Sequence, residues 1–191
     1  FVFPGQGSQY VGMGRDLYET YPEARALFDE TDRILGFPLS KLCFEGPKEE
    51  LDDTLNTQPA IFAMSVACVE ALRLRSSANP LFVAGHSLGE YTALVAADAL
   101  DFADGLRLVR ERGRLMKEVG EFNPGAMAAI IGLDPETLER ICQEASIQFP
   151  GSSIQIANYN SPGQIVISGH KEALEWALEL TRERGARRVI P

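Results

Sequence analysis

The feature that most constrains this chain is an apolar run followed at once by a serine between two glycines. Residues 81–84 have the composition of a short buried strand. Gly85, Ser87 and Gly89 then spell G-x-S-x-G, and apolar residues recur at helical spacing across 88–95. A strand, a sharp turn and a helix in this order form a nucleophile elbow, whereas the alternative is an ordinary strand–helix turn that happens to hold a serine. The flanking pattern favours the elbow and predicts a nucleophile at Ser87.

A second glycine-containing loop follows an apolar triplet at the start of the sequence. Residues 1–3 are typical of a strand, and the loop 4–9 places Gly5 and Gly7 on either side of Gln6. Such a loop lets the backbone bend close to a ligand, although a simple strand–helix turn would look the same. The pattern does not match a phosphate-binding loop, because the run does not end in Lys-Ser or Lys-Thr.

The overall charge and the cysteine pattern narrow the class of protein. The formal net charge of −9 argues against nucleic acid or an anionic membrane as a partner. No apolar run approaches the ~20 residues that span a bilayer, and no basic-then-apolar leader opens the sequence. Cys43, Cys68 and Cys142 are widely spaced without a C-x-x-C pair, which is typical of reduced thiols and not of a disulfide framework or a metal site. We therefore expect a cytoplasmic protein without a bound metal or cofactor.

The first part of the chain is predicted to be mainly helical between its two strands. Helical periodicity covers 16–35 with a break at Pro22, and 38–50 is predicted to be irregular. Asn56 and Thr57 are predicted to cap a helix that is apolar nearly all round and therefore buried.

A later helix, predicted over 102–119 with Asp101 as its N-cap, carries a row of basic side chains. These side chains recur three or four residues apart and share one face: Arg107, Arg110, Arg114 and Lys117. Arg112 lies off this row. A basic row of this kind is usually a solvated surface.

Beyond a Gly- and Pro-containing break at 119–125, the periodicity alternates between strand and helix. The predicted order is strand, helix, strand, strand, helix, strand, at 126–131, 135–145, 154–157, 164–168, 172–184 and 187–190. This is the order of a ferredoxin-like domain. We therefore predict a catalytic core over 1–122 and a small subdomain over 123–191.

Several short motifs, in a fixed order along the chain, carry a family resemblance. They are Phe-Pro-Gly-Gln-Gly-Ser-Gln at 3–9, Thr-Gln-Pro-Ala at 57–60, Gly-His-Ser-Leu-Gly-Glu at 85–90, Arg-Gly-x-x-Met at 112–116 and Asn-Ser-Pro-Gly-Gln at 160–164. With them the chain resembles the malonyl-CoA:acyl carrier protein transacylases and the related acyltransferase domains of fatty acid and polyketide synthases. The resemblance implies an α/β fold in which an α/β-hydrolase-like core with a parallel sheet carries an inserted ferredoxin-like (βαββαβ) subdomain.

The resemblance also implies roles for particular residues. Ser87 would take the malonyl group from coenzyme A as an ester and pass it to the phosphopantetheine thiol of acyl carrier protein. The backbone N–H groups of Gln6 and Leu88 would form the oxyanion hole. Arg112 would bind the free carboxylate of the malonyl group, since a planar guanidinium matches a carboxylate with two hydrogen bonds. From the residues alone, Arg112 is equally well one more arginine on a basic helix.

The histidine that serves as general base in this family has no counterpart among the matching motifs. His86 lies inside the elbow motif, and His170 opens a predicted helix in a segment that does not match the catalytic one. Because strand-like triplets begin and end the sequence, we expect the chain to stop before the base. A serine without a base is a poor nucleophile, so we expect slow or absent acyl transfer by these 191 residues alone.

Two other functions use the same features. A serine esterase or thioesterase would act through the same elbow, but a neutral ester would not need Arg112, and the loop 4–9 differs from the His-Gly-Gly-Gly oxyanion segment of esterases. The third hypothesis is a module that binds the carrier protein and catalyses no reaction.

The partners implied by the resemblance are malonyl-CoA and acyl carrier protein, bound by a monomeric enzyme of fatty acid biosynthesis. The motifs are compatible with either malonyl or methylmalonyl as the transferred group. Because acyl carrier proteins are acidic in this family context, docking to this acidic chain needs a basic patch. The candidates are the helical row above and, favoured here, a group in the small subdomain: Lys171, Arg182, Arg184, Arg187 and Arg188.

Overall fold

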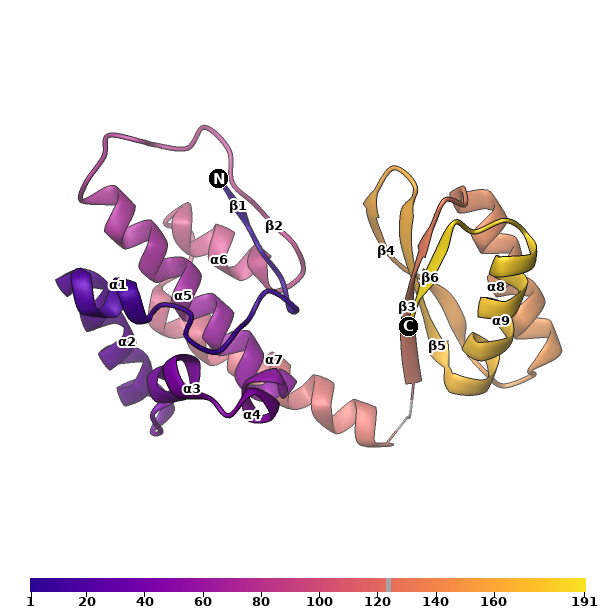
Figure 1. The fold of residues 1–191 in the computed structure, drawn as a ribbon, viewed down its shortest axis with the longest axis horizontal. Helices are drawn as coiled ribbons and strands as arrows, with labels where there is room; N and C mark the ends of the chain where they lie inside the picture. The colour runs from indigo at the N-terminus through magenta and orange to yellow at the C-terminus, as the bar shows by residue number, and fades with distance from the viewer. Residues whose placement is uncertain (123–124) are drawn as a thin grey trace. The chain divides into compact units, whose positions relative to one another are not determined.

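The computed structural model of the chain describes residues 1–122 and 125–191, so the predicted turn at Asn123 and Pro124 lies outside the described residues. These residues form two compact units, Phe1–Glu118 and Val119–Pro191. Helices and strands occur in both units, which makes the chain a mixed α/β protein (Figure 1). None of the described helices is both long and apolar enough to cross a membrane.

The first unit is built around α5 (Thr54–Arg73), a helix that buries residues on nearly all of its sides. Its side chains Ile61 and Phe62 pack in one cluster with Leu106 and Val109 of α7 (Phe102–Phe122), the last helix that begins in this unit. The other elements that begin in this unit are β1 (Val2–Phe3), α1 (Arg15–Thr20), α2 (Pro22–Leu35), α3 (Leu39–Glu45), α4 (Lys48–Asp52), β2 (Ala84–Gly85), α6 (Gly89–Ala96) and α7 (Phe102–Phe122).

The prediction of an irregular segment over 38–50 is wrong, because α3 lies within it and α4 begins in it. Each of these helices begins directly after a proline: α3 after Pro38 and α4 after Pro47. Proline is tolerated at the entry to a helix, so these two residues start the helices and do not exclude them. The helices are stabilised by apolar side chains that are buried in one cluster: Leu39, Leu42, Cys43 and Leu51.

The predicted cap of α5 at Asn56 and Thr57 is also wrong, because the helix begins at Thr54. The N-cap is Asp53, whose side chain accepts a hydrogen bond from the backbone N–H of Leu55 at 3.0 Å. Asp, Asn and Thr all suit a cap, so local preference alone could not choose among neighbouring candidates.

Helix α5 accommodates Pro59 through a contact with α7. Proline has no N–H, so Pro59 leaves the carbonyl four residues before it, that of Leu55, without its helical donor. Arg110 of α7 donates its Nη1 to this Leu55 carbonyl at 2.7 Å. One arginine of the basic row therefore satisfies the backbone of α5 instead of facing only solvent.

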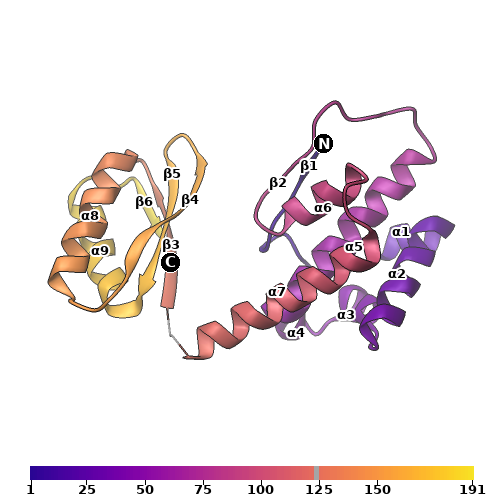
Figure 2. The same ribbon diagram turned by 180° about the vertical axis from the view of Figure 1, so that it is seen from behind.

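Strands β1 and β2 form a two-stranded parallel sheet. The views of Figures 1 and 2 show them side by side, with α6 following directly after β2. The prediction of a buried strand over 81–84 is wrong, because the strand begins only at Ala84 and none of the four residues is buried. Leu81 and Phe82 are 92% and 86% exposed. Among the described residues β1 is the sole strand neighbour of β2, so no element buries these two side chains.

The second unit is a four-stranded antiparallel sheet with two helices against it (Figure 2). Its elements follow the predicted order: β3 (Gly125–Ile131), α8 (Pro135–Gln148), β4 (Ile154–Ser161), β5 (Gln164–His170), α9 (Lys171–Glu183) and β6 (Arg188–Ile190). The strand order across the sheet is β4-β5-β3-β6. Ile130 and Ile167 of the strands are buried in one core with Leu138 and Leu174 of the helices.

Removal of the α5 cap is expected to destabilise the chain in a pH-dependent way. Mainly through its hydrogen bond to the Asp53 carboxylate, Lys117 holds the pKa of Asp53 below its usual range. This stabilisation is present above the unfolded-state pKa of about 3.9 and is lost as the pH falls through the lower folded-state pKa. Asp53→Ala should lower the free energy of unfolding by about 1–2 kcal/mol near neutral pH, measured by urea denaturation.

The control for this prediction is Asp53→Asn, which can still cap the helix but cannot pair with Lys117. It should cost less than the alanine variant near neutral pH, and both differences from the unmodified chain should shrink toward about pH 3. A difference between Asp53→Ala and the unmodified chain that is independent of pH would contradict the assignment.

Candidate active site

Ser87 lies on the sharp turn between β2 and α6. Its φ of 53° is in the left-handed region, which a residue other than glycine rarely adopts and which costs backbone energy. The residue is exposed. The predicted nucleophile therefore lies on a strained turn with solvent access.

The two glycines of the motif are required by close contacts. A Cβ on Gly85 would lie 1.9 Å from the carbonyl carbon of Gly89, and a Cβ on Gly89 would lie 2.4 Å from the carbonyl oxygen of Phe3. Both distances are far shorter than van der Waals contact. Any larger residue would therefore push the strands and α6 apart, so the G-x-S-x-G spacing is a packing requirement of this turn.

The loop that follows β1 packs against the same turn. A Cβ on Gly5 would lie 2.7 Å from the carbonyl oxygen of His86, so the loop and the turn touch through their backbones. The exposed Gln6 comes next, and its side-chain Oε1 accepts a hydrogen bond from Thr54 Oγ1 at 3.0 Å. The loop is thus tied both to the turn and to the start of α5.

Leu88 is fully buried and immediately precedes the first residue of α6. Backbone N–H groups in the first turn of a helix lack intrahelical partners and carry partial positive charge. This is a favourable place for an oxyanion, and the role of the Leu88 and Gln6 N–H groups in binding one stays a prediction.

Arg112 reaches Ser87 from α7. Its Nη2 donates to Ser87 Oγ at 2.8 Å, and its Nη1 donates to Oε1 of Gln58 at 2.5 Å. The helix can come this close because the next residue is a glycine: a Cβ on Gly113 would lie 2.8 Å from the carbonyl oxygen of Thr54. The Arg-Gly pair thus lets α7 approach the first turn of α5 with the guanidinium beside the serine.

The basic row of α7 is occupied by partners within the first unit. These partners are Asp104 for Arg107, the Leu55 carbonyl for Arg110, Glu111 and Glu118 for Arg114, and Asp53 for Lys117. Among the described residues, Arg112 forms no ion pair, and its hydrogen-bond partners Gln58 and Ser87 are neutral. A guanidinium without a carboxylate beside it keeps its charge available for an anionic ligand.

One of the two histidines lies in the second unit, and the other lies next to Ser87 in the serine turn. His170 precedes α9, and its Nδ1 accepts a hydrogen bond from the backbone N–H of Ser153 at 2.8 Å within the second unit. His86 donates its backbone N–H to the carbonyl oxygen of Phe3 at 3.0 Å. Neither of these two hydrogen bonds involves the Ser87 hydroxyl.

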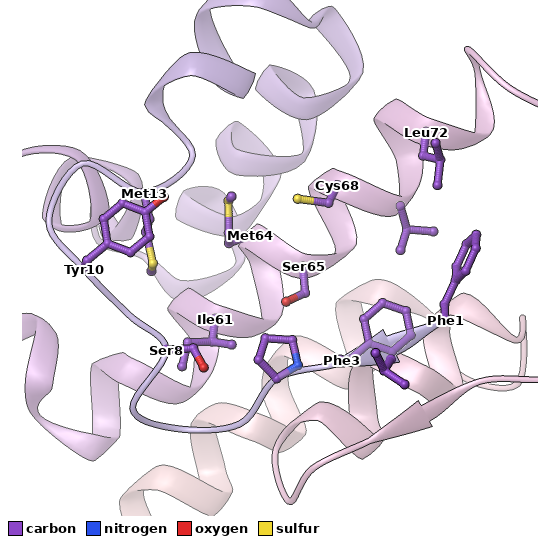
Figure 3. A pocket seen from close by; sticks show the side chains of 13 residues that line it. Phe1, Phe3, Ser8, Tyr10, Met13, Ile61, Met64, Ser65, Cys68 and Leu72 are labelled. Carbon is purple, nitrogen blue, oxygen red and sulfur yellow. The ribbon is translucent and has the colours of Figure 1, made fainter. Parts of the chain in front are cut away.

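A separate apolar hollow of about 440 Å³ lies along α5 and β1 (Figure 3). Its walls include Phe3, Met13 and Met64. Neither Ser87 nor Arg112 lines it. The hollow is therefore distinct from the candidate active site.

The cysteines are weak competitors of Ser87 as nucleophiles. Burial raises the pKa of the Cys43 thiol to about 12 and that of the Cys142 thiol to about 11. Cys68 is exposed at the apolar hollow, and desolvation raises its pKa as well (Figure 3). All three therefore remain thiols near neutral pH, and a thiol is much less nucleophilic than a thiolate.

Sequence reasoning assigned no role to Thr54 and Gln58, which contact the predicted site residues. Gln58 is fully buried, and its Nε2 donates to Thr54 Oγ1 at 3.1 Å. The signal that could have identified Gln58 is a long polar side chain at an apolar face of a buried helix, because a buried amide requires hydrogen-bond partners. Thr54 carries no such signal.

A serine on a strained turn between a strand and a helix is the arrangement of enzymes that form acyl-serine esters. The chain belongs to the acyl transferase domain family, whose model matches residues 1–190.

Relatives and solved structures resemble the whole chain. It is 51% identical to the malonyl CoA-acyl carrier protein transacylase of Bacillus subtilis and 48% identical to that of Escherichia coli K12, over 191 residues in both cases. These matches cover 100% of the chain but only 59% and 61% of the relatives, so the chain spans less than two thirds of their length. An acyl carrier protein S-malonyltransferase from Vibrio cholerae superimposes with a TM-score of 0.93 at 45% identity, covering 100% of this chain and 61% of that one.

Proposed function

We propose that this chain carries the acyl-serine chemistry of a malonyl-CoA:acyl carrier protein transacylase. In the first step Ser87 Oγ attacks the thioester carbonyl of malonyl-CoA, its proton passes to a base, and coenzyme A leaves as the thiol. In the second step the phosphopantetheine thiol of the carrier protein attacks the serine ester and regenerates the hydroxyl. The names of the relatives support this substrate and this acceptor.

The observation that carries the proposal is the contact between Arg112 Nη2 and Ser87 Oγ at 2.8 Å. A malonyl group on the serine bears a free carboxylate a short distance from the ester carbonyl, so a cation beside the hydroxyl is placed to bind it. The negative charge that develops on the ester carbonyl would be bound by the N–H groups of Gln6 and Leu88.

The distribution of basic side chains favours the second unit as the carrier-binding surface. Two members of the predicted group have acidic partners. Lys171 lies 4.0 Å from Glu175, and Arg184 forms an ion pair with Glu144 at 2.6 Å. Among the residues that the structure describes, none forms an ion pair with Arg187 or Arg188. We propose that these two arginines contact the acidic carrier protein, an example of which is bound to its malonyl-transacylase in a solved structure that is 46% identical to this chain with a TM-score of 0.93.

The arrangement of elements supports a more specific fold within the mixed α/β class. The parallel pair β1 and β2 followed by the serine turn suits an α/β-hydrolase-like core over 1–122. The sheet order β4-β5-β3-β6 suits a ferredoxin-like subdomain over 123–191. We propose this division as the domain organisation.

A serine esterase or thioesterase is the second candidate, because the same turn serves hydrolysis. The unpaired charge of Arg112 argues against it, since a neutral ester offers nothing for a guanidinium to bind and leaves its desolvation uncompensated. The two functions differ in the acceptor of the acyl group, which is water in one and a thiol in the other.

Intact-protein mass spectrometry with malonyl-CoA tests the proposal. We expect the mass of the chain to rise by one malonyl group and to return to its original value when carrier protein bearing its phosphopantetheine thiol is added, with the malonyl group recovered on the carrier. Recovery of free malonate in place of malonyl-carrier would indicate a hydrolase, and binding of the carrier without any adduct would indicate a docking module.

The adduct is expected to form slowly. Neither His86 nor His170 matches the family's general base, and a serine hydroxyl without a base reacts poorly near neutral pH. The initial rate should therefore be far below that of the Bacillus subtilis relative assayed under the same conditions. Equal rates for the two proteins would overturn this expectation while leaving the assignment of the reaction intact.

A further inference from the structure

The hydroxyl of Thr54 joins two parts of the candidate site. Thr54 Oγ1 donates a hydrogen bond to Gln6 Oε1 at 3.0 Å and accepts one from Gln58 Nε2 at 3.1 Å. A hydroxyl has one proton to donate and two lone pairs to accept with, so both bonds can form at once. The loop that holds Gln6 and the amide that touches Arg112 are thus connected through a single oxygen.

The orientation of the Gln58 amide follows from its neighbours. Its Nε2 faces two acceptors, Thr54 Oγ1 at 3.1 Å and Met116 Sδ at 3.3 Å, while its Oε1 accepts from Arg112 Nη1 at 2.5 Å. The side chain is fully buried, so an unpaired amide group would be costly. If the amide turned over, its N–H groups would face the guanidinium, which has only donors to offer.

The direction of Arg112 depends in turn on this amide. Gln58 Oε1 occupies Nη1, which leaves Nη2 directed at Ser87 Oγ. Arginine has a long side chain with several rotamers, and Arg112 is partly exposed to solvent. A second anchor is therefore needed to hold the guanidinium in one position beside the serine.

We infer that Thr54 is a positioning residue that fixes the Gln58 amide and, through it, the carboxylate-binding guanidinium of Arg112. This inference rests on the proposed function. Its consequence is selectivity: the Thr54 hydroxyl favours acyl groups with a free carboxylate over neutral acyl groups, although it touches neither. It also holds the Gln6 side chain, so the oxyanion loop and the carboxylate site are set by the same hydroxyl.

The test compares Thr54→Val, which keeps the shape but removes the hydroxyl, with Thr54→Ser, which keeps the hydroxyl. Both are made in a Ser87→Ala chain, so that binding is measured without chemistry or a base. Calorimetry gives the dissociation constants of malonyl-CoA and acetyl-CoA, and their ratio reports carboxylate selectivity. Thr54→Val should lower the selectivity for malonyl-CoA roughly 10-fold, the value of one hydrogen bond to a charged group, and Thr54→Ser should stay within about threefold of the parent.

Two further variants separate the possible failures. Arg112→Leu in the same background must abolish the selectivity; if it does not, or if the parent binds neither ligand, the proposed function fails and not the role of Thr54 alone. If Arg112→Leu abolishes the selectivity and Thr54→Val retains it, the positioning role is wrong. Should Thr54→Val not fold, as judged by thermal unfolding, Gln58→Met removes the Arg112 acceptor that Thr54 is inferred to orient, and it is expected to lower the selectivity at least as much. Unchanged selectivity in that variant also overturns the inference.

Discussion

Ser87→Ala is expected to abolish the covalent malonyl adduct of this chain. The ester requires the serine oxygen, and loss of a nucleophile at such a site lowers the rate roughly 10⁴-fold or more. The measurement is intact mass after incubation with malonyl-CoA, followed by peptide mapping. The fold should be retained, because alanine on an exposed turn removes only the Oγ contact with Arg112.

A matched control for this variant is Ser76→Ala, which removes an exposed serine hydroxyl elsewhere in the first unit. It should acylate like the unmodified chain. Peptide mapping also checks Cys68, the exposed thiol. An adduct that persists in Ser87→Ala, or that maps to Cys68 in the unmodified chain, would contradict the role of Ser87.

Arg112→Leu is expected to lower the rate of acylation by malonyl-CoA about 100-fold and to leave that by acetyl-CoA nearly unchanged. Two charge-assisted hydrogen bonds to a carboxylate contribute about 3 kcal/mol together, and each 1.4 kcal/mol is tenfold. Arg112→Lys keeps the charge but has no planar fork, so we expect an intermediate loss of about 10-fold. Single-turnover acylation with each thioester, followed by mass spectrometry, measures both rates.

The control is Arg107→Leu on the same helix. Arg107 is exposed and paired with Asp104, so its removal should change neither rate by more than about threefold. Equal losses with malonyl-CoA and acetyl-CoA in Arg112→Leu would mean that the arginine supports the turn in general and does not recognise a carboxylate.

The local pattern of the sequence was sufficient for the elements whose order and periodicity are strong. The G-x-S-x-G motif predicted the turn at Ser87, because the contacts that Gly85 and Gly89 make are with residues of the same turn or the adjoining strand. The second unit was predicted element by element, since its strands and helices are regular and joined by short turns. The predicted element bounds were wrong where the local pattern allowed more than one start for a helix. Asp53 is the N-cap of α5 although Asn56 and Thr57 also suit a cap, and α4 begins directly after Pro47 in a segment predicted to be irregular.

The sequence by itself determined that a serine follows a strand and opens a helix, and that an arginine lies off the basic row of a later helix. Only the tertiary structure decided that Arg112 is the arginine beside Ser87, and that Thr54 and Gln58 hold it there. The physical reason is distance along the chain: hydrogen bonds that join α7 to α5 and to the serine turn connect residues from 25 to 58 positions apart. Periodicity reports which face of one element is apolar, but the partner that orients a charged side chain is chosen by how separate elements pack.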